Sequence, residues 1–216
     1  MSRPASATIA SMYYGERFNG YTHLAGAVMA LGAGTALVAL GAMRNDPWRI
    51  GSFTVYAVTL FSLFLISTLY HSTRGPSKML WRKLDHVAIY LLIAGSYTPV
   101  ALVTLKDDWG WTLFCAVWAL AFLGIVQELF VARGARLTSL FIYLLMGWLG
   151  VAALDPLLVG LGPHGFAWML AAGLVYTLGV VFYFFDERFN HWHGIWHCFV
   201  LAGSALYYAA LVRFVA

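Results

Sequence analysis

The chain has 216 residues, of which 62% are hydrophobic and 10% are charged, and its mean hydropathy is +0.77. A soluble domain carries about 25% charged residues. The composition therefore excludes an ordinary soluble globular domain and predicts a protein whose core is surrounded by lipid. The net charge of +4 comes from scattered lysines and arginines without a long basic cluster, so we expect no nucleic-acid partner.

Two further features restrict the class of protein. Segment 1–21 contains no short apolar run followed by a small-residue cleavage site, which predicts that no signal peptide is removed. The chain has two cysteines, Cys115 and Cys198, so we expect no disulfide framework. Because no long linker, low-complexity tract or clear repeat interrupts the chain, we expect a single domain, 1–216.

Seven apolar runs of about 20 residues follow one another, and a helix needs about that length to cross the roughly 30 Å of hydrocarbon in a bilayer. The runs cover residues 21–43, 48–70, 84–105, 109–131, 137–154, 166–185 and 192–215. Short segments rich in turn residues separate them, and Pro99 inside the third run predicts a kink. The sequence thus predicts an all-α, polytopic membrane protein with a seven-helix bundle.

Lysine and arginine are distributed unequally between the two predicted sides of the membrane. Nine lie in the N-terminal segment and in the loops after the second, fourth and sixth runs: Arg3, Arg17, Arg74, Lys78, Arg82, Lys83, Arg133, Arg136 and Arg188. Four lie on the other side: Arg44, Arg49, Lys106 and Arg213. Because loops rich in positive charge stay in the cytoplasm, this difference predicts a multi-pass protein of the cell membrane with a short cytoplasmic N-terminal segment, 1–20, and an external C-terminus.

The histidines gather at the predicted cytoplasmic ends of the runs. All except His164 lie there, namely His23, His71, His86, His191, His193 and His197. His193 and His197 are four residues apart, so they share one face of a helix, one turn apart. Polar groups inside a membrane are costly and usually functional. This convergence, which played no part in the count of lysine and arginine, predicts a functional site near the cytoplasmic face.

Three of these histidines suit a metal site. His71, His193 and His197 could hold one Zn²⁺ in the open arrangement of catalytic zinc, with a water in the fourth position. Zinc lowers the pKa of such a water from about 15.7 toward about 7. Copper and iron also accept imidazole, so zinc is a preference among metals. The alternative is that these are interfacial histidines that bond to lipid headgroups or to backbone.

Two other side chains are expected to complete the site. Asp85 opens the third run at the same depth, and is the candidate to orient the water and take its proton. Ser67 lies four residues before His71 on the same helix face, where it could hydrogen-bond the water, Asp85 or a substrate carbonyl. The alternative for Asp85 is that it caps the third helix or pairs with Lys83 or Arg82.

The entry to the first helix carries three polar side chains, Glu16, Asn19 and His23. They either hold a ligand imidazole in place or form an interfacial polar face. His86 points about 100° away from Asp85 on a helix, so we expect it to bond to a neighbouring helix. Glu128 is expected to reach the interface or to pair with Arg133.

Four motifs occur in order along the chain: Glu16-x-x-Asn19-x-x-Thr22-His23, Ser67-x-x-Tyr70-His71, Leu84-Asp85-His86 and His193-Gly-Ile-Trp-His197. Each lies beside a predicted helix end. Together they resemble the haemolysin III branch of the progestin and adipoQ receptor family, and the resemblance covers essentially the whole chain. It implies a seven-helix fold distinct from that of G-protein-coupled receptors, with a cytoplasmic N-terminus.

The resemblance also implies roles for individual residues. In the adiponectin receptors, which the family includes, one histidine of the second helix and two of the seventh hold zinc near the cytoplasmic face, and an aspartate of the third helix contacts it through water. Matched by motif, these are His71, His193, His197 and Asp85. The receptors resemble ceramide-hydrolysing amidases. The chain lacks the long N-terminal extension of the animal receptors, so hormone reception is not expected.

The candidate site predicts a zinc-dependent intramembrane hydrolase that cuts a lipid amide or ester bond, with membrane lipids as its partners. One alternative is a regulator or receptor of membrane lipid state, or a membrane-perturbing or pore protein, with a structural zinc. A transporter that relays protons or cations is disfavoured, because the outer halves of the helices carry almost no charge. A haem protein is disfavoured, because paired histidines on one helix suit a single small ion. Assembly as a homo-oligomer stays open.

Overall fold

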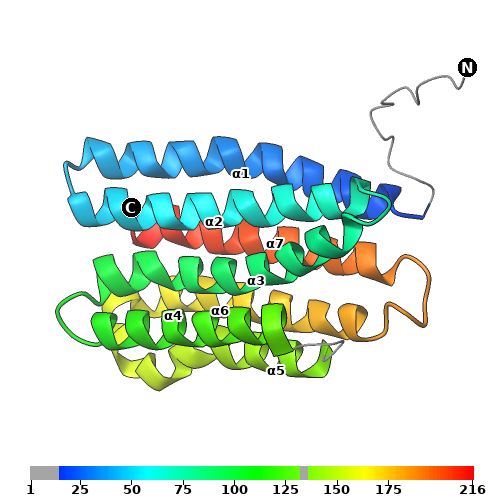
Figure 1. Cartoon of the computed structure of the whole chain (residues 1–216). Coiled ribbons are helices and arrows are strands. Elements are labelled where there is room, and N and C mark those ends of the chain that lie inside the picture. The colour runs from blue at the N-terminus through cyan, green and yellow to red at the C-terminus, as the bar shows by residue number, and fades with distance from the viewer. Residues whose placement is uncertain (1–14, 132–135) are drawn as a thin grey trace, which may run out of the picture.

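In the computed structural model, which describes residues 15–131 and 136–216, the chain forms a bundle of helices joined by short turns (Figure 1). The α-helices are α1 (Arg17–Met43), α2 (Pro47–Ser72), α3 (Lys78–Pro99), α4 (Gly110–Val126), α5 (Arg136–Gly147), α6 (Leu154–Phe184) and α7 (Trp192–Phe214). Three five-residue segments complete it: the π-helices η1 (Val100–Thr104) and η2 (Gln127–Val131), and the 3₁₀-helix η3 (Leu149–Ala153). No strand occurs within these described ranges, so the all-α prediction is confirmed.

Six helical stretches of the described chain are long and apolar enough to cross a membrane: Arg17–Met43, Pro47–Ser72, Lys78–Thr104, Gly110–Phe130, Arg136–Phe184 and Trp192–Phe214. The predicted count of seven is not reproduced, because two of the predicted runs fall within the single stretch Arg136–Phe184. That stretch has 49 residues and is not straight. It contains η3, and Gly162 interrupts the helical backbone with φ 69° and ψ 168°.

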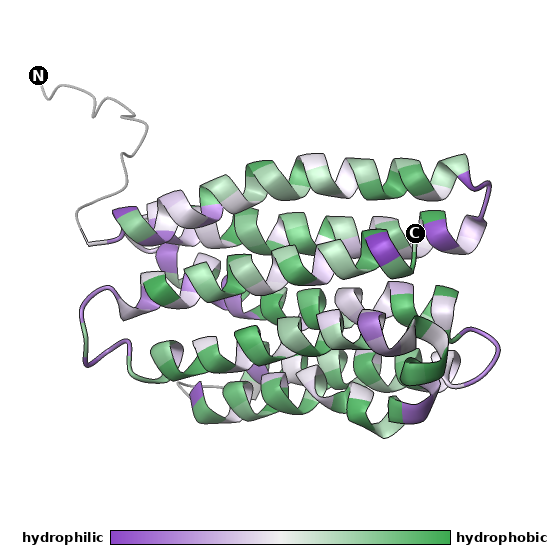
Figure 2. Cartoon of the chain, turned by 180° about the vertical axis from the view of Figure 1, so that it is seen from behind, coloured by the Kyte–Doolittle hydropathy of each residue, from purple (hydrophilic) through white to green (hydrophobic). Residues whose placement is uncertain are grey.

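The outer surface of the bundle suits contact with lipid chains rather than water. Figure 2 shows hydrophilic residues gathered in the loops and at the helix ends, with apolar helices between them. Large apolar side chains such as Val28, Phe122 and Val159 point outward and are 68%, 66% and 87% exposed. A water-soluble protein rarely exposes so many, whereas in a bilayer these side chains meet hydrocarbon.

Small residues let the helices approach closely, as is common in membrane bundles. A Cβ added to Gly95 of α3 would lie 2.1 Å from Oγ1 of Thr59 in α2. A Cβ added to Gly194 of α7 would lie 2.1 Å from the ring of Phe18 and 2.9 Å from Oδ1 of Asn19, both in α1. The second contact fixes the start of α7 against the start of α1.

The helix directions bring several helix ends together at one end of the bundle, which we call the site end (Figure 1). It contains the starts of α1, α3, α5 and α7 and the ends of α2, η2 and α6. All histidines expected at the cytoplasmic ends belong to these segments. His164 lies in α6 just after the break at Gly162, away from the site end.

The helices extend beyond the predicted apolar runs at the site end. Helix α3 begins at Lys78 rather than at residue 84, so Asp85 lies about two turns inside the helix. The prediction that Asp85 opens the helix, and the alternative that it caps it, are therefore wrong. The physical reason is that the first turns of α3 carry Arg82 and Lys83, which a hydropathy criterion excludes although they are helical.

Candidate metal centre

Three histidines from two helices form a compact cluster at the site end. His71 lies in the last turn of α2, and His193 and His197 lie on one face of the first turns of α7. One nitrogen from each ring lies within 4.8 Å of the other two. The ring centroids are 4.7–5.1 Å apart. His71 and His197 are buried and His193 is half-buried, so a single ion could reach all three from the interior.

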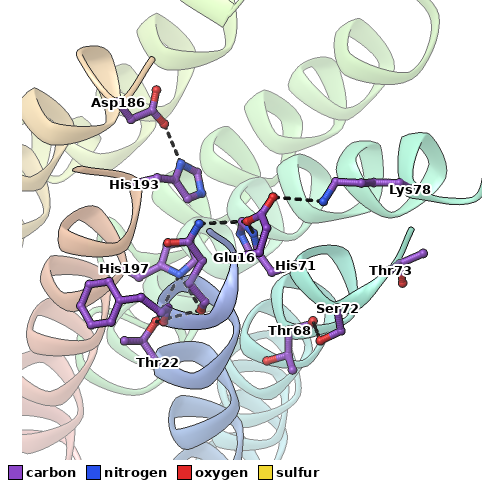
Figure 3. Close-up of polar contacts among 12 residues, drawn as sticks. Glu16, Thr22, Thr68, His71, Ser72, Thr73, Lys78, Asp186, His193 and His197 are labelled. Carbon is purple, nitrogen blue, oxygen red and sulfur yellow. Dashed lines mark hydrogen bonds and ion pairs between the residues drawn. The ribbon is translucent and has the colours of Figure 1, made fainter. Parts of the chain in front are cut away.

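Each ring of the cluster is held through Nδ1 by an oxygen atom outside the cluster (Figure 3). Nδ1 of His71 lies 2.5 Å from Oε2 of Glu16, and Nδ1 of His193 lies 2.6 Å from Oδ2 of Asp186. Nδ1 of His197 lies 3.0 Å from the backbone oxygen of Asn19. Carboxylate and carbonyl oxygens only accept hydrogen bonds, so Nδ1 of each ring is the protonated nitrogen.

The two carboxyl groups are ionised, as this role requires. Partial burial by itself raises the pKa of Glu16, but hydrogen bonds from His71, Asn19 and Lys78 lower the pKa well below its ordinary value. Burial likewise opposes the ionisation of Asp186, while bonds from His193 and Arg136 lower its pKa below the ordinary range. Both groups are therefore charged acceptors for the imidazole N–H groups at neutral pH.

With Nδ1 occupied, Nε2 is the nitrogen available to a ligand. Nε2 of His71 is buried and has no hydrogen-bond partner among the described residues. A buried polar atom without a partner is uncommon and calls for an explanation such as a bound ion. Histidines that bind metals commonly donate their other ring N–H to a carboxylate or a backbone carbonyl, which is the arrangement found here. The three imidazoles thus fit a metal ion.

Asp85 and Ser67 lie in the same cavity as the three histidines. The carboxylate of Asp85 is within electrostatic reach of His71 and His193. Ser67 is buried, and its hydroxyl oxygen forms no hydrogen bond of normal geometry within the described residues. Since Ser67 precedes His71 by one helical turn, its hydroxyl lies on the face of α2 that carries the imidazole of His71. All five predicted site residues therefore come together.

The cavity has a volume of about 1020 Å³ and extends from the site end far into the bundle. At the site end it is lined by Glu16, Asp85, Asp186 and the histidine cluster. Farther from the site end, its walls are formed by Leu113, Leu161 and Phe166. Leu113 lies in the first turn of α4, and the other two lie on either side of the break at Gly162 in α6. The cavity therefore joins a polar end, which contains the histidine cluster, to a long apolar interior.

A family model described as haemolysin-III related matches residues 12–208. This protein belongs to the haemolysin-III-related family. Hemolysin-3 of Bacillus cereus is 41% identical over 202 residues, which cover 93% of this chain and 91% of the relative. The Hemolysin-3 homolog of Bacillus subtilis (strain 168) is 41% identical over 206 residues, or 92% and 96% of the two chains.

A human protein, the Monocyte to macrophage differentiation factor, is 29% identical over 224 residues, which cover 98% of this chain and 89% of the relative. This match fits the wider progestin and adipoQ receptor family, so the predicted resemblance is confirmed. Together with the six apolar helical stretches, membership identifies this haemolysin-III-related protein as a multi-pass protein of the cell membrane.

In this haemolysin-III-related protein, the polar residues at the start of α1 hold imidazoles in place rather than only forming an interfacial polar face. Glu16 and Asn19 both hold imidazoles of the histidine cluster. Asn19 does so through its backbone oxygen, while its side chain donates to Glu16 at 3.0 Å. His23 stacks on His197, with centroids 3.6 Å apart and the ring planes 11° from parallel. The stacked ring restricts how His197 can turn.

Asp186 is a residue of the candidate site that the sequence did not predict, because the segment Asp186-Glu187-Arg188 has the composition of a turn. In the structure Asp186 bridges two elements: it accepts from His193, and it pairs with Arg136 of α5 at 2.6 Å. An acidic residue a few positions before a paired-histidine motif was the available signal. The expectation that Glu128 reaches the interface was wrong, and its alternative, a pair with Arg133, is not tested. Glu128 is buried and bonds to His86, whereas Arg133 lies outside the described residues.

Replacing Asp186 by Asn is expected to weaken Zn²⁺ binding by about 10–100-fold, the usual cost of losing a group that orients a ligand imidazole. The affinity can be measured by competition with a chromogenic chelator. Glu187→Gln is the matched control, because Glu187 is 86% exposed and also pairs with Arg136, but is not hydrogen-bonded to His193 in the described structure. Equal affinities of the two variants would contradict the role of Asp186.

Proposed function

We propose that this haemolysin-III-related protein is a zinc-dependent intramembrane hydrolase that cuts an amide or ester bond of a lipid. The observation that carries this proposal is the inward set of three imidazoles, each held through Nδ1, beside Asp85 at the polar end of a long apolar cavity. Three histidine ligands leave a coordination position open, as in catalytic zinc sites.

Bound zinc would supply a Lewis acid for a substrate carbonyl and would lower the pKa of a water toward about 7. The chain's own residues would do the rest. Asp85 would accept a proton from the attacking water. Ser67, whose buried hydroxyl lies close to Asp85, would donate a hydrogen bond to the carbonyl oxygen of the substrate.

The cavity supports a lipid as the substrate. Its volume of about 1020 Å³ is at the upper end of ligand pockets, which range over about 300–1,000 Å³. Its apolar depth suits an acyl chain, while its polar end lies at the helix ends, near the interface where headgroups are linked to chains. A substrate bond held at this polar end would be accessible to water at the metal, while the apolar walls would keep water away from the rest of the substrate.

We infer that the chain crosses the membrane seven times, with the N-terminus in the cytoplasm. A straight helix of 49 residues would be about 74 Å long, more than twice the roughly 30 Å of the hydrocarbon layer. Since Gly162 interrupts Arg136–Phe184, the stretch would cross once on each side of this break. The unequal distribution of lysine and arginine supports the cytoplasmic assignment of the site end.

Single-cysteine labelling tests this topology, with Cys115 and Cys198 replaced. A membrane-impermeant maleimide is expected to modify Ser77→Cys and Glu187→Cys only from the cytoplasmic side, and His164→Cys only from outside. All three positions are exposed. The opposite pattern would reverse the orientation. Labelling of Glu187→Cys and Ser77→Cys from different sides would exclude a second crossing within Arg136–Phe184.

A second function, membrane lysis, is favoured by the name Hemolysin-3 of the Bacillus relatives, and a bound metal would then be structural. One experiment separates the two functions. Purified protein is assayed for bound metal, then reconstituted in vesicles that contain amide-linked and ester-linked lipids, and both lipid products and dye leakage are followed. Metal-dependent product formation supports the hydrolase. Leakage without any product, at full zinc occupancy, would support the second function instead.

A further inference from the structure

A second polar cluster lies at the site end, formed by His86 of α3, Glu128 of η2 and Ser139 of α5. Nδ1 of His86 lies 2.8 Å from Oε1 of Glu128. The hydroxyl of Ser139 donates to Oε2 of the same carboxylate at 2.8 Å. The two oxygens of Glu128 are thus used by two different elements, and the three residues act as one hydrogen-bonded unit.

A buried carboxylate in a membrane helix is costly and usually has a function. Glu128 is 7% exposed and lies in a π-helical segment, a form often found at functional sites. Packing alone does not require an acidic side chain at this position. A carboxylate does, however, suit one role, because it fixes the imidazole of His86 through Nδ1–H and stabilises that ring when it becomes positively charged.

The other nitrogen of His86 is available to the cavity. His86 and Glu128 both line the same cavity as the histidine cluster and Asp85. Nε2 of His86 has no hydrogen bond within the described part of the chain, and 18% of the side chain is accessible. His86 faces η2 and α5, since it bonds to Glu128 of η2 and its backbone oxygen accepts from Tyr143 of α5. The histidine cluster, by contrast, belongs to α2 and α7. The cavity therefore has a proton-carrying group on each of two walls.

We propose that His86, held by Glu128, is the proton donor to the leaving group of the lipid substrate. This inference rests on the hydrolase proposed above. In the step, the water oxygen adds to the carbonyl carbon while Asp85 takes one proton of that water. The bond from this carbon to the leaving nitrogen or oxygen then breaks, its electron pair stays on the leaving atom, and Nε2 of His86 gives that atom a proton.

The proton taken by Asp85 then replaces the one given by its neighbour His86. One water is consumed, and the products are a carboxylic acid and a free amine or alcohol. The reaction needs a proton donor, His86, as well as a base, Asp85, for a physical reason. An amine or an alkyl alcohol is too basic to leave as an anion, so protonation by an acid in the transition state is worth about 10²–10⁴-fold.

The test compares substrates that differ in their leaving group, using the full-length protein loaded with Zn²⁺. His86→Asn keeps an N–H close to the position of Nδ1, and so retains a donor to Glu128, but it has no counterpart of Nε2. We expect kcat to fall by about 10²-fold or more on an amide or alkyl ester. On a nitrophenyl ester with the same acyl chain the loss should be at least about tenfold smaller, because nitrophenolate leaves without a proton.

Two further measurements separate a chemical role from a structural one. The zinc content of His86→Asn should stay close to that of the parent, since His86 does not belong to the histidine cluster. Its thermal stability should also stay close, since Asn keeps a donor to Glu128. Glu128→Gln keeps an acceptor but loses the charge that stabilises protonated His86, so it should show the same dependence on the leaving group. Equal losses on both substrate types, or rates like those of the parent, would overturn the role of His86.

The same assays show whether a failure concerns only the role of His86 or the hydrolase as a whole. A parent protein that cleaves none of the amide and ester lipids overturns both. Turnover that requires Asp85 on every substrate, but is unchanged in His86→Asn and Glu128→Gln, overturns only the role of His86 and leaves the hydrolase in place.

Discussion

Replacing Asp85 by Asn is expected to lower the rate of lipid hydrolysis by about 10²–10⁴-fold, the usual contribution of a general base. Asn has nearly the same shape as Asp but cannot take a proton from water. Because the three candidate metal ligands are the imidazoles of His71, His193 and His197, the variant should keep its zinc. Zinc content and the rate of product formation, measured on the same preparation, test this expectation.

Asp107→Asn is the matched control for Asp85→Asn. Asp107 is exposed in the turn before α4, away from the site end, so the same change of charge there should leave hydrolysis unaffected. Parent-like turnover in Asp85→Asn would remove Asp85 as the base. Loss of zinc together with activity would instead assign Asp85 to the metal centre itself.

Replacing His193 or His197 by Ala is expected to reduce bound zinc from about one ion per chain to a small fraction, because either change leaves only two imidazole ligands. The variants should also unfold at a lower temperature. A ligand that binds only the folded protein stabilises it by about 2.7 kcal/mol when its free concentration is about 100 times its Kd. Elemental analysis and thermal unfolding, each with and without added zinc, measure the two effects.

His164→Ala controls for the loss of an imidazole as such, since His164 is exposed and lies away from the site end, just after the break at Gly162 in α6. It should bind as much zinc as the parent and be stabilised by zinc to the same extent. Full zinc occupancy in a His193→Ala, His197→Ala double variant would show that the metal lies elsewhere. A stability difference that persists when zinc is removed from both proteins would point to packing rather than to metal binding.

At the site end, residue spacing along the chain predicts which side chains share a helix face, but not which residues of other helices they contact. The spacing of His193 and His197 places both rings on one helix face, and the structure confirms that placement. The expectation that His86 bonds to a neighbouring helix is also confirmed. Its partner could not be identified, because Glu128 is 42 residues away and belongs to η2, whose position depends on the packing of α4 against α3.

Composition and hydropathy determined the class of this protein, an all-α protein of the cell membrane, because each apolar run must bury its own backbone polar groups in a helix to lie in lipid. Histidine spacing and motif order determined the candidate cluster and the family. Only the tertiary structure decided what holds each imidazole: a carboxylate of Glu16, a carboxylate of Asp186 and the backbone oxygen of Asn19. Two of these acceptors lie at the start of α1 and the third in the turn between α6 and α7, and an oxygen atom becomes the partner of a given ring only when the helices pack.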